Sequence, residues 1–328
     1  MMRLSSTQAK RIYTMMQFIR KAEEAIADNY SSGQMRCPTH LSIGQECVPA
    51  VLSEILTNND LAVSTHRAHA HYLAKGGSLD AMVAEIYGKA TGCSGGRGGS
   101  MHLIDESVGF MGSTAIVGNT IPIGVGLALA KKIKSESGIA VVFLGDGAIE
   151  EGVFYESANF AALKKLPVLF VCENNLYSVY SSLKDRQPMG RKIHELAASI
   201  GLWAKHGNGN SVEEAYNICL EAYKHVLSGQ GAAFIELDTY RWREHCGPNY
   251  DNDIGYRSVA EYEKYRANDP IAAFEAQLIE NKIISQVDCS NVVDEINRKI
   301  AQAFESAKAA PFPDELSRYQ HVYAQESV

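Results

Sequence analysis

The sequence predicts an α/β fold: a doubly wound parallel sheet with helices on both faces. Short apolar runs of strand type alternate with longer segments of helical character. Polar residues close two of these runs, and the segments between the runs are long enough for crossover helices. This alternation is typical of βαβ units, whose strands are parallel. We expect strands at 61–63, 139–144, 167–172, 202–205 and 233–238.

The helical segments follow from apolar periodicity. Residues 5–32 carry an apolar stripe with charges between, which predicts an N-terminal helix that packs on the core or on a partner. A helical C-terminal extension is expected at about 258–328, amphipathic up to 309, within a single domain over residues 1–328. Further helices are expected at 45–56, 79–90, 118–132, 151–163, 193–200 and 211–228.

Composition excludes several classes of function. No run of about 18 uncharged apolar residues exists, so we expect no membrane span. The net charge is −7 and no block of Lys or Arg occurs, which argues against a nucleic-acid partner. The chain starts without the apolar stretch of a signal peptide, and its seven cysteines are widely spaced with no C-x-x-C pair. We therefore expect a cytoplasmic protein with reduced thiols.

Two polar motifs follow neighbouring strands of the predicted sheet. Gly145-Asp146-Gly147 closes one apolar run, and Asn174-Asn175 follows the next. Because the carboxyl ends of parallel strands meet at one edge, the two motifs are expected to lie together. Asp146 offers a carboxylate oxygen and Asn175 an amide oxygen, while the glycines let backbone N–H groups approach phosphate. The set fits a diphosphate bridged by Mg2+, although each motif alone is a common turn or loop.

At this spacing the motif resembles that of the thiamine diphosphate enzymes. The resemblance implies that Mg2+ is bound by the Asp146 and Asn175 side chains and the Tyr177 backbone carbonyl. Over residues 10–250 the chain is similar to the alpha chain of the heterotetrameric 2-oxo acid dehydrogenase first components, including the pyruvate and acetoin branches. The matching stretches are Thr39–Glu46, Ser64–His69, Gly98–His102, Ala115–Gly118 and Thr239–Trp242.

The resemblance also assigns contacts to the cofactor. The backbone from Ala115 to Val117 is expected to hold the aminopyrimidine, and Gly147 and Ala148 to contact the diphosphate. Arg67 is our candidate for a further diphosphate contact, because a guanidinium offers forked donors to phosphate oxygens.

Three histidines are the candidate catalytic residues. His40 and His66 are expected near the diphosphate or the substrate, and His66 replaces a Tyr that is usual in the pyruvate branch, which favours the acetoin branch. By the resemblance, His245 lines the channel to the thiazolium, contacts the cofactor and assists proton transfer. A zinc cluster of His66, His69 and His71 is the alternative reading. We interpret Gly95–Gly99 as a flexible loop that lets His102 approach the site, with a purely structural turn as the alternative.

The expected partners also follow from the resemblance. In the family a glutamate on a separate pyrimidine-binding domain completes the site, and the ~80 residues after position 250 are too few for a second α/β domain. We therefore expect a beta subunit in an α2β2 assembly. A 2-oxo acid or acetoin is the expected small-molecule substrate, and a lipoyl-bearing acyltransferase the expected acceptor.

Two other functions stay open. The loop at 243–253 departs from the family, with Glu244 in place of a glycine and Cys246 in place of a serine that some relatives phosphorylate. This change allows a non-oxidative carboligase, which would join an acyl-anion unit to an aldehyde or sugar ketone. A non-catalytic scaffold would be expected to lose Asp146, Asn175 or His245, all of which are present.

Overall fold

The structure, a computed structural model, describes residues 4–320. In these residues the main sheet has six strands in the order β2-β1-β3-β4-β8-β7, and every neighbouring pair is parallel. The predicted fold class is confirmed. The strands are β1 (Leu61–Ser64), β2 (Phe110–Ser113), β3 (Ala140–Gly145), β4 (Val168–Asn174), β7 (Trp203–Asn208) and β8 (Ala233–Asp238).

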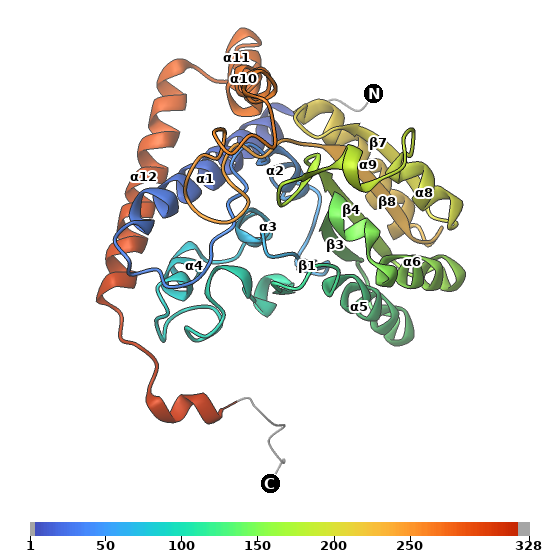
Figure 1. Cartoon of the computed structure of the whole chain (residues 1–328), viewed down its shortest axis with the longest axis horizontal. Helices are drawn as coiled ribbons and strands as arrows, with labels where there is room; N and C mark the ends of the chain where they lie inside the picture. Colours follow the sequence, from blue (N-terminus) through green and yellow to red (C-terminus); the bar gives the residue numbers. More distant parts are fainter. Residues whose placement is uncertain (1–3, 321–328) are drawn as a thin grey trace.

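Helices cover both faces of this sheet (Figure 1). Because side chains alternate along a strand, Leu169 and Val171 of β4 enter one core cluster while Val168 and Phe170 enter the other. The second cluster is covered by α5 (Thr120–Lys134), α6 (Gly152–Lys164) and α8 (Ile193–Ser199). The first cluster is covered by α1 (Ser6–Tyr30), α2 (Cys47–Leu52), α3 (His69–Ala74), α4 (Leu79–Ile86) and α9 (Val212–Leu227).

The C-terminal extension packs on the N-terminal helix of the same chain. It consists of α10 (Val259–Ala267), α11 (Pro270–Glu280) and α12 (Gln286–Ala309), and Figure 1 shows α12 running beside α1. Both long helices begin with a capping box, at Ser5 in α1 and at Ser285 in α12, which satisfies free N–H groups of the first turn. The predicted extension beyond residue 320 lies outside the described residues.

Several expectations need correction. The helix predicted over 45–56 is confined to α2, and α4 ends four residues early because Gly88 has a positive φ of 68°. Sequence patterns missed α3 and β2, a four-residue edge strand whose pairing register with β1 shifts between Phe110 and Gly112. The polar stretch after β4 holds a hairpin of β5 (Tyr177–Ser178) and β6 (Ser181–Ser182), followed by α7 (Leu183–Arg186).

No helix in residues 4–320 is both long enough and apolar enough to cross a bilayer.

Candidate active site

The two polar motifs meet at the carboxyl end of the sheet, as predicted. β3 ends at Gly145, which pairs with Glu173 of β4, so Asp146 and Asn175 follow neighbouring strand ends. Asp146 opens a short 3-10 helix, η3 (Asp146–Glu150). A cavity of about 110 Å³ lies at this edge. The predicted site residues that line it are His66, Arg67, Val117, Asp146, Gly147, Ala148, Asn175, Tyr177 and His245.

Asp146 is a buried carboxylate with a cationic partner. It is 1% exposed, and it pairs with the guanidinium of Arg186 on α7, which also contacts Glu150. Burial raises the pKa of Asp146, opposed by Arg186 and by the backbone N–H groups of Asp146 and Asn175. A buried carboxylate requires such compensation, because desolvation penalises its charge. The sequence did not predict this role of Arg186, because Arg186 lies forty residues from Asp146 and belongs to no motif.

Asn175 is held in a defined orientation. Its Nδ2 donates to Oε1 of Gln45 at 2.9 Å, and its Oδ1 accepts from the backbone N–H of Tyr177 at 3.2 Å. Both Gln45 and Tyr177 also line the cavity. The amide oxygen therefore faces the turn that carries the Tyr177 backbone. Gln45 is a second residue whose place in the site the sequence did not predict.

The three candidate catalytic histidines form one cluster. The His40 ring centroid lies 4.6 Å from that of His66 and 5.1 Å from that of His245, and the other two are 5.3 Å apart. Burial, and then the charge of Arg67, lower the pKa of His40 to about 2 and the pKa values of His66 and His245 to about 3. All three imidazoles are therefore neutral near pH 7, and each has one nitrogen that can accept a hydrogen bond and one that can donate.

Arg67 connects this cluster to the protein backbone. Its guanidinium donates to the carbonyl oxygens of Leu41 and His245, and its Nη2 lies 3.5 Å from Nδ1 of His245. Burial, followed by the charge of Arg241, lowers the pKa of Arg67 to about 9. The guanidinium is thus fixed in direction at the cavity wall, with part of its donor capacity already used.

Comparison with known sequences identifies the family. The sequence model of the dehydrogenase E1 component matches residues 14–315. The chain belongs to this family.

Its relatives include the pyruvate dehydrogenase E1 component subunit alpha of Rickettsia felis, 35% identical over 94% of this chain and 93% of the relative. The chloroplastic subunit alpha-3 of Arabidopsis thaliana is 35% identical over 98% of this chain and 76% of that protein. The subunit alpha of Porphyra purpurea is 33% identical, covering 94% and 91%. The expected 2-oxo acid dehydrogenase alpha chain, with thiamine diphosphate as its cofactor, is confirmed at family level. Neither the carboligase nor the scaffold alternative gains support, and the preference for acetoin drawn from His66 stays a prediction.

The zinc alternative is not supported by the geometry. His71 sits between Ser64 and Glu173, with hydrogen bonds of 2.7 and 2.9 Å. His69 sits between Ser100 and Glu23, at 2.7 and 3.3 Å. Each ring thus has both nitrogens engaged by side chains of other segments. Within residues 4–320, neither histidine belongs to a group whose ligand atoms could share a metal ion.

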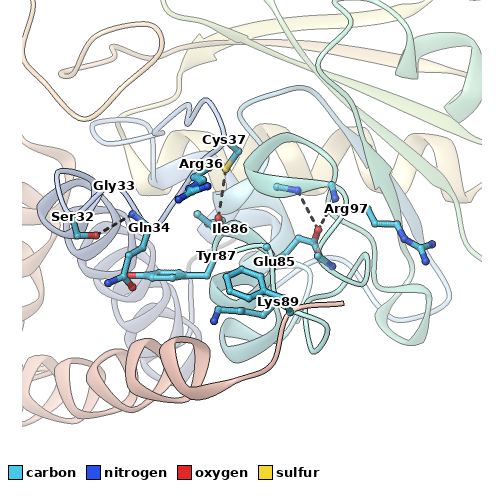
Figure 2. Close-up of a pocket in the computed structure, with 15 residues that line it drawn as sticks. Ser32, Gly33, Gln34, Arg36, Cys37, Glu85, Ile86, Tyr87, Lys89 and Arg97 are labelled. Atoms are coloured by element: carbon cyan, nitrogen blue, oxygen red, sulfur yellow. Dashed lines mark hydrogen bonds between the residues drawn. The ribbon is translucent and has the colours of Figure 1, made fainter. Parts of the chain in front are cut away.

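The glycine-rich loop is anchored rather than free. The buried carboxylate of Glu85 accepts hydrogen bonds from the N–H groups of the loop, at 2.7 Å from Ser94, 2.8 Å from Gly96, 2.6 Å from Gly98 and 3.1 Å from Gly99. Figure 2 shows Glu85 reaching into the loop beside a cavity, whose volume is about 790 Å³. These hydrogen bonds favour the alternative of a structural turn, because the Glu85 carboxylate already occupies the loop.

Ala115 and His102 lie beside the site rather than in its lining. His102 accepts at Nε2 from the backbone N–H of Ala115 at 3.3 Å, and its Nδ1 lies 3.0 Å from the Gly98 carbonyl oxygen. This hydrogen-bonded path joins the anchored loop to the backbone of 115–117.

The loop at 243–253, which departs from the family, is held by contacts of its own. The Glu244 carboxylate accepts a hydrogen bond from the backbone N–H of Asn249 at 2.8 Å.

Proposed function

We propose that this chain is the alpha subunit of a thiamine diphosphate- and Mg2+-dependent dehydrogenase that cleaves a 2-oxo acid of the pyruvate type. The acyl unit passes to a lipoyl acceptor, and a beta subunit completes the site. One observation carries the proposal: a buried carboxylate, an oriented amide and the neutral imidazoles of His66 and His245 line one cavity at the carboxyl edge of the sheet, and the His40 ring, outside the lining, packs against both imidazoles. The names of the relatives supply the pyruvate-type substrate.

The donors at the edge suit the expected Mg2+ and diphosphate. The Asp146 carboxylate, the Asn175 amide oxygen and the Tyr177 carbonyl are hard oxygen ligands of the kind Mg2+ takes. Asp146 is already buried against a cation, so a metal ion there meets a carboxylate whose charge the protein maintains. On the diphosphate side, Gly147 and Ala148 offer backbone N–H groups and Arg67 a guanidinium.

The segment proposed to hold the aminopyrimidine presents apolar surface. Ile116 is 65% exposed and Val117 47% exposed, and Val117 lines the cavity. Exposed branched side chains beside a polar cavity suit the face of an aromatic ring, because burying them is favourable.

The neutral histidines are placed to hydrogen-bond the substrate. When bound, thiamine diphosphate supplies the nucleophilic carbon and the electron sink for loss of CO2. An arginine only donates, so Nδ1 of His245 accepts from Arg67 and the proton of the neutral ring resides on Nε2. That N–H is placed to donate a hydrogen bond to a substrate oxygen. His40 and His66, whose lowered pKa values keep both rings uncharged, can accept hydrogen bonds in the same cluster.

The size of the cavity supports a second subunit. Complete small-molecule sites have volumes of roughly 300–1,000 Å³, whereas this cavity measures about 110 Å³. We infer that a beta subunit encloses the rest of the cofactor and supplies the glutamate for the aminopyrimidine, in an α2β2 assembly.

The test is reconstitution with a beta-type partner. Reduction of a dye acceptor by pyruvate should require both chains, thiamine diphosphate and Mg2+, and acetoin tested in parallel decides the donor. Each chain assayed alone is the control. Formation of a coupled product from pyruvate and an aldehyde, without dye reduction, would favour the carboligase. Turnover of neither kind, with the cofactor bound, would favour the scaffold.

A further inference from the structure

A second cluster of ligand-type side chains lies at the far edge of the sheet. His206 on β7 is paired in register with Glu236 on β8, and Asp238 follows two residues later on the same face of β8. Nε2 of His206 lies 2.9 Å from Oδ2 of Asp238. One ligand atom from each of the three side chains lies within 4.8 Å of the others.

The strands fix this arrangement. Residues opposite each other on paired strands hold their side chains side by side, and residues i and i+2 of one strand share a face. Neighbours orient the central carboxylate further: Nδ1 of His194 lies 2.8 Å from Oε2 of Glu236, and Nδ2 of Asn174 donates to Oε1 at 2.8 Å. Sites built on rigid strands with oriented ligands hold metal ions more tightly than sites on loops.

The charge of the cluster also favours a cation. Two carboxylates on one face of a strand repel each other, and the imidazoles compensate them only when protonated. The histidine cluster of the cofactor cavity, His40, His66 and His245, differs in this respect, because its nearest charge is the Arg67 guanidinium. Arg67 opposes a cation at those three rings, although not at Asp146 across the cavity, whereas the two carboxylates attract a cation at the far edge. His206 is 40% exposed and Asp238 49% exposed, so an ion has access from solvent.

We propose that His206, Glu236 and Asp238 form a binding site for a divalent transition-metal ion, with Zn2+ as the representative ligand. One imidazole and two carboxylates are a donor set that such ions accept, with water at the remaining position. The ion takes the place of the hydrogen bond between His206 and Asp238 and joins β7 to β8. His194, at the start of α8, is hydrogen-bonded to Glu236, so an ion bound to Glu236 also stabilises the start of this helix.

The experiment is calorimetric titration of ZnCl2 into metal-stripped protein reconstituted with its beta-type partner. Thiamine diphosphate and Mg2+ are bound first and the excess is removed by desalting, so that the cofactor cavity is filled. We expect one additional Zn2+ site per chain. His206→Gln and Asp238→Asn should each weaken it at least tenfold, since each removes a ligand. Zn2+ should raise the Tm of the parent protein and leave that of His206→Gln unchanged.

His225→Gln is the matched control. His225 is a partly buried histidine that stacks on Trp203, and no carboxylate contacts it in the part of the chain that the structure describes. Its replacement should leave Zn2+ affinity unchanged. Zn2+ affinity in His206→Gln equal to that of the parent, or no Zn2+ binding by the parent, overturns the proposal. The same series on the chain alone keeps this test independent of cofactor binding.

Discussion

Two glycine-rich segments of this chain resemble phosphate sites in sequence, and the structure uses them differently. Gly145–Gly147 ends a central strand and opens onto a cavity. Gly95–Gly99 forms a loop whose N–H groups point at the carboxylate of Glu85. The residues of the first segment line the cavity wall. The backbone N–H groups of the second segment are already hydrogen-bonded to the Glu85 carboxylate.

The difference shows that glycines alone do not make a ligand site. Successive N–H groups form an anion-binding concavity wherever the backbone allows it. Whether a ligand or a side chain enters it depends on tertiary contacts, here on α4, which delivers Glu85 from below the loop. The two regions therefore predict opposite responses to mutation: loss of binding at the first, and loss of stability at the second.

The largest effect is expected at the first region. Asp146→Ala removes the only carboxylate among the proposed Mg2+ ligands, and should weaken Mg2+-dependent binding of thiamine diphosphate by about 100-fold or more. Calorimetry on the reconstituted protein measures this effect. Asp185→Ala, an acidic neighbour on α7 that bonds only Ser182 in the described residues, is the control. If Asp146→Ala still bound thiamine diphosphate tightly, the assignment of Asp146 as a Mg2+ ligand would be wrong.

At the second region the expected effect is on folding. Glu85→Ala leaves several loop N–H groups without a partner and should lower the free energy of unfolding by about 3 kcal/mol. Urea denaturation measures it, and acetate, which can enter the vacated space, should restore part of the loss. Glu106→Ala, at an exposed position, is the control. A stable Glu85→Ala protein would show that the carboxylate does not hold the loop.

Arg186→Gln sharpens the contrast. It leaves the buried Asp146 carboxylate without its cation, so the cofactor-free protein should lose about 3 kcal/mol of stability. Mg2+ and thiamine diphosphate should offset most of this loss by giving Asp146 a new partner, whereas they should not rescue Glu85→Ala. Thermal melts with and without cofactor compare the two variants. Equal rescue of both would contradict the assigned difference between the regions.

His245→Ala should separate chemistry from binding. The role in proton transfer that the resemblance implies predicts a fall in turnover of about 100-fold with little change in cofactor affinity. Dye-reduction kinetics and calorimetry measure the two quantities. His225→Ala, on α9 and away from the cavity, serves as the control. An unchanged rate would mean that the altered loop has left the active site.

The smallest effect concerns pH. The folded pKa of His66 is lowered to about 3, below the unfolded value of about 6.5. Below pH about 6.5 the unfolded chain therefore binds a proton that the folded chain does not, and stability falls as pH drops toward 3. Replacing the ring by His66→Gln should make this decline shallower. Urea midpoints at pH 7, 6 and 5 test it, and equal slopes for both proteins would contradict it.

Sequence patterns predicted the central strands and the edge residues because both depend on local signals. β3 and β4 are continuous apolar runs, and parallel pairing brings their ends together without further information. The sequence did not predict the role of Arg186, because its partner Asp146 is forty residues away. It did not predict the role of Glu85, because its partners are backbone N–H groups. The strand β2 was missed because it has only four residues, two of them Gly and Ser, and the sheet pairs it on one edge only.

The central claim is that this chain holds half of a split cofactor site. Titration of thiamine diphosphate with Mg2+ into the purified chain, alone and then with a beta-type partner, tests it most directly. The account predicts weak or undetectable binding to the chain alone and tight stoichiometric binding when the partner is present. Equally tight binding without the partner, or none with it, would contradict the account.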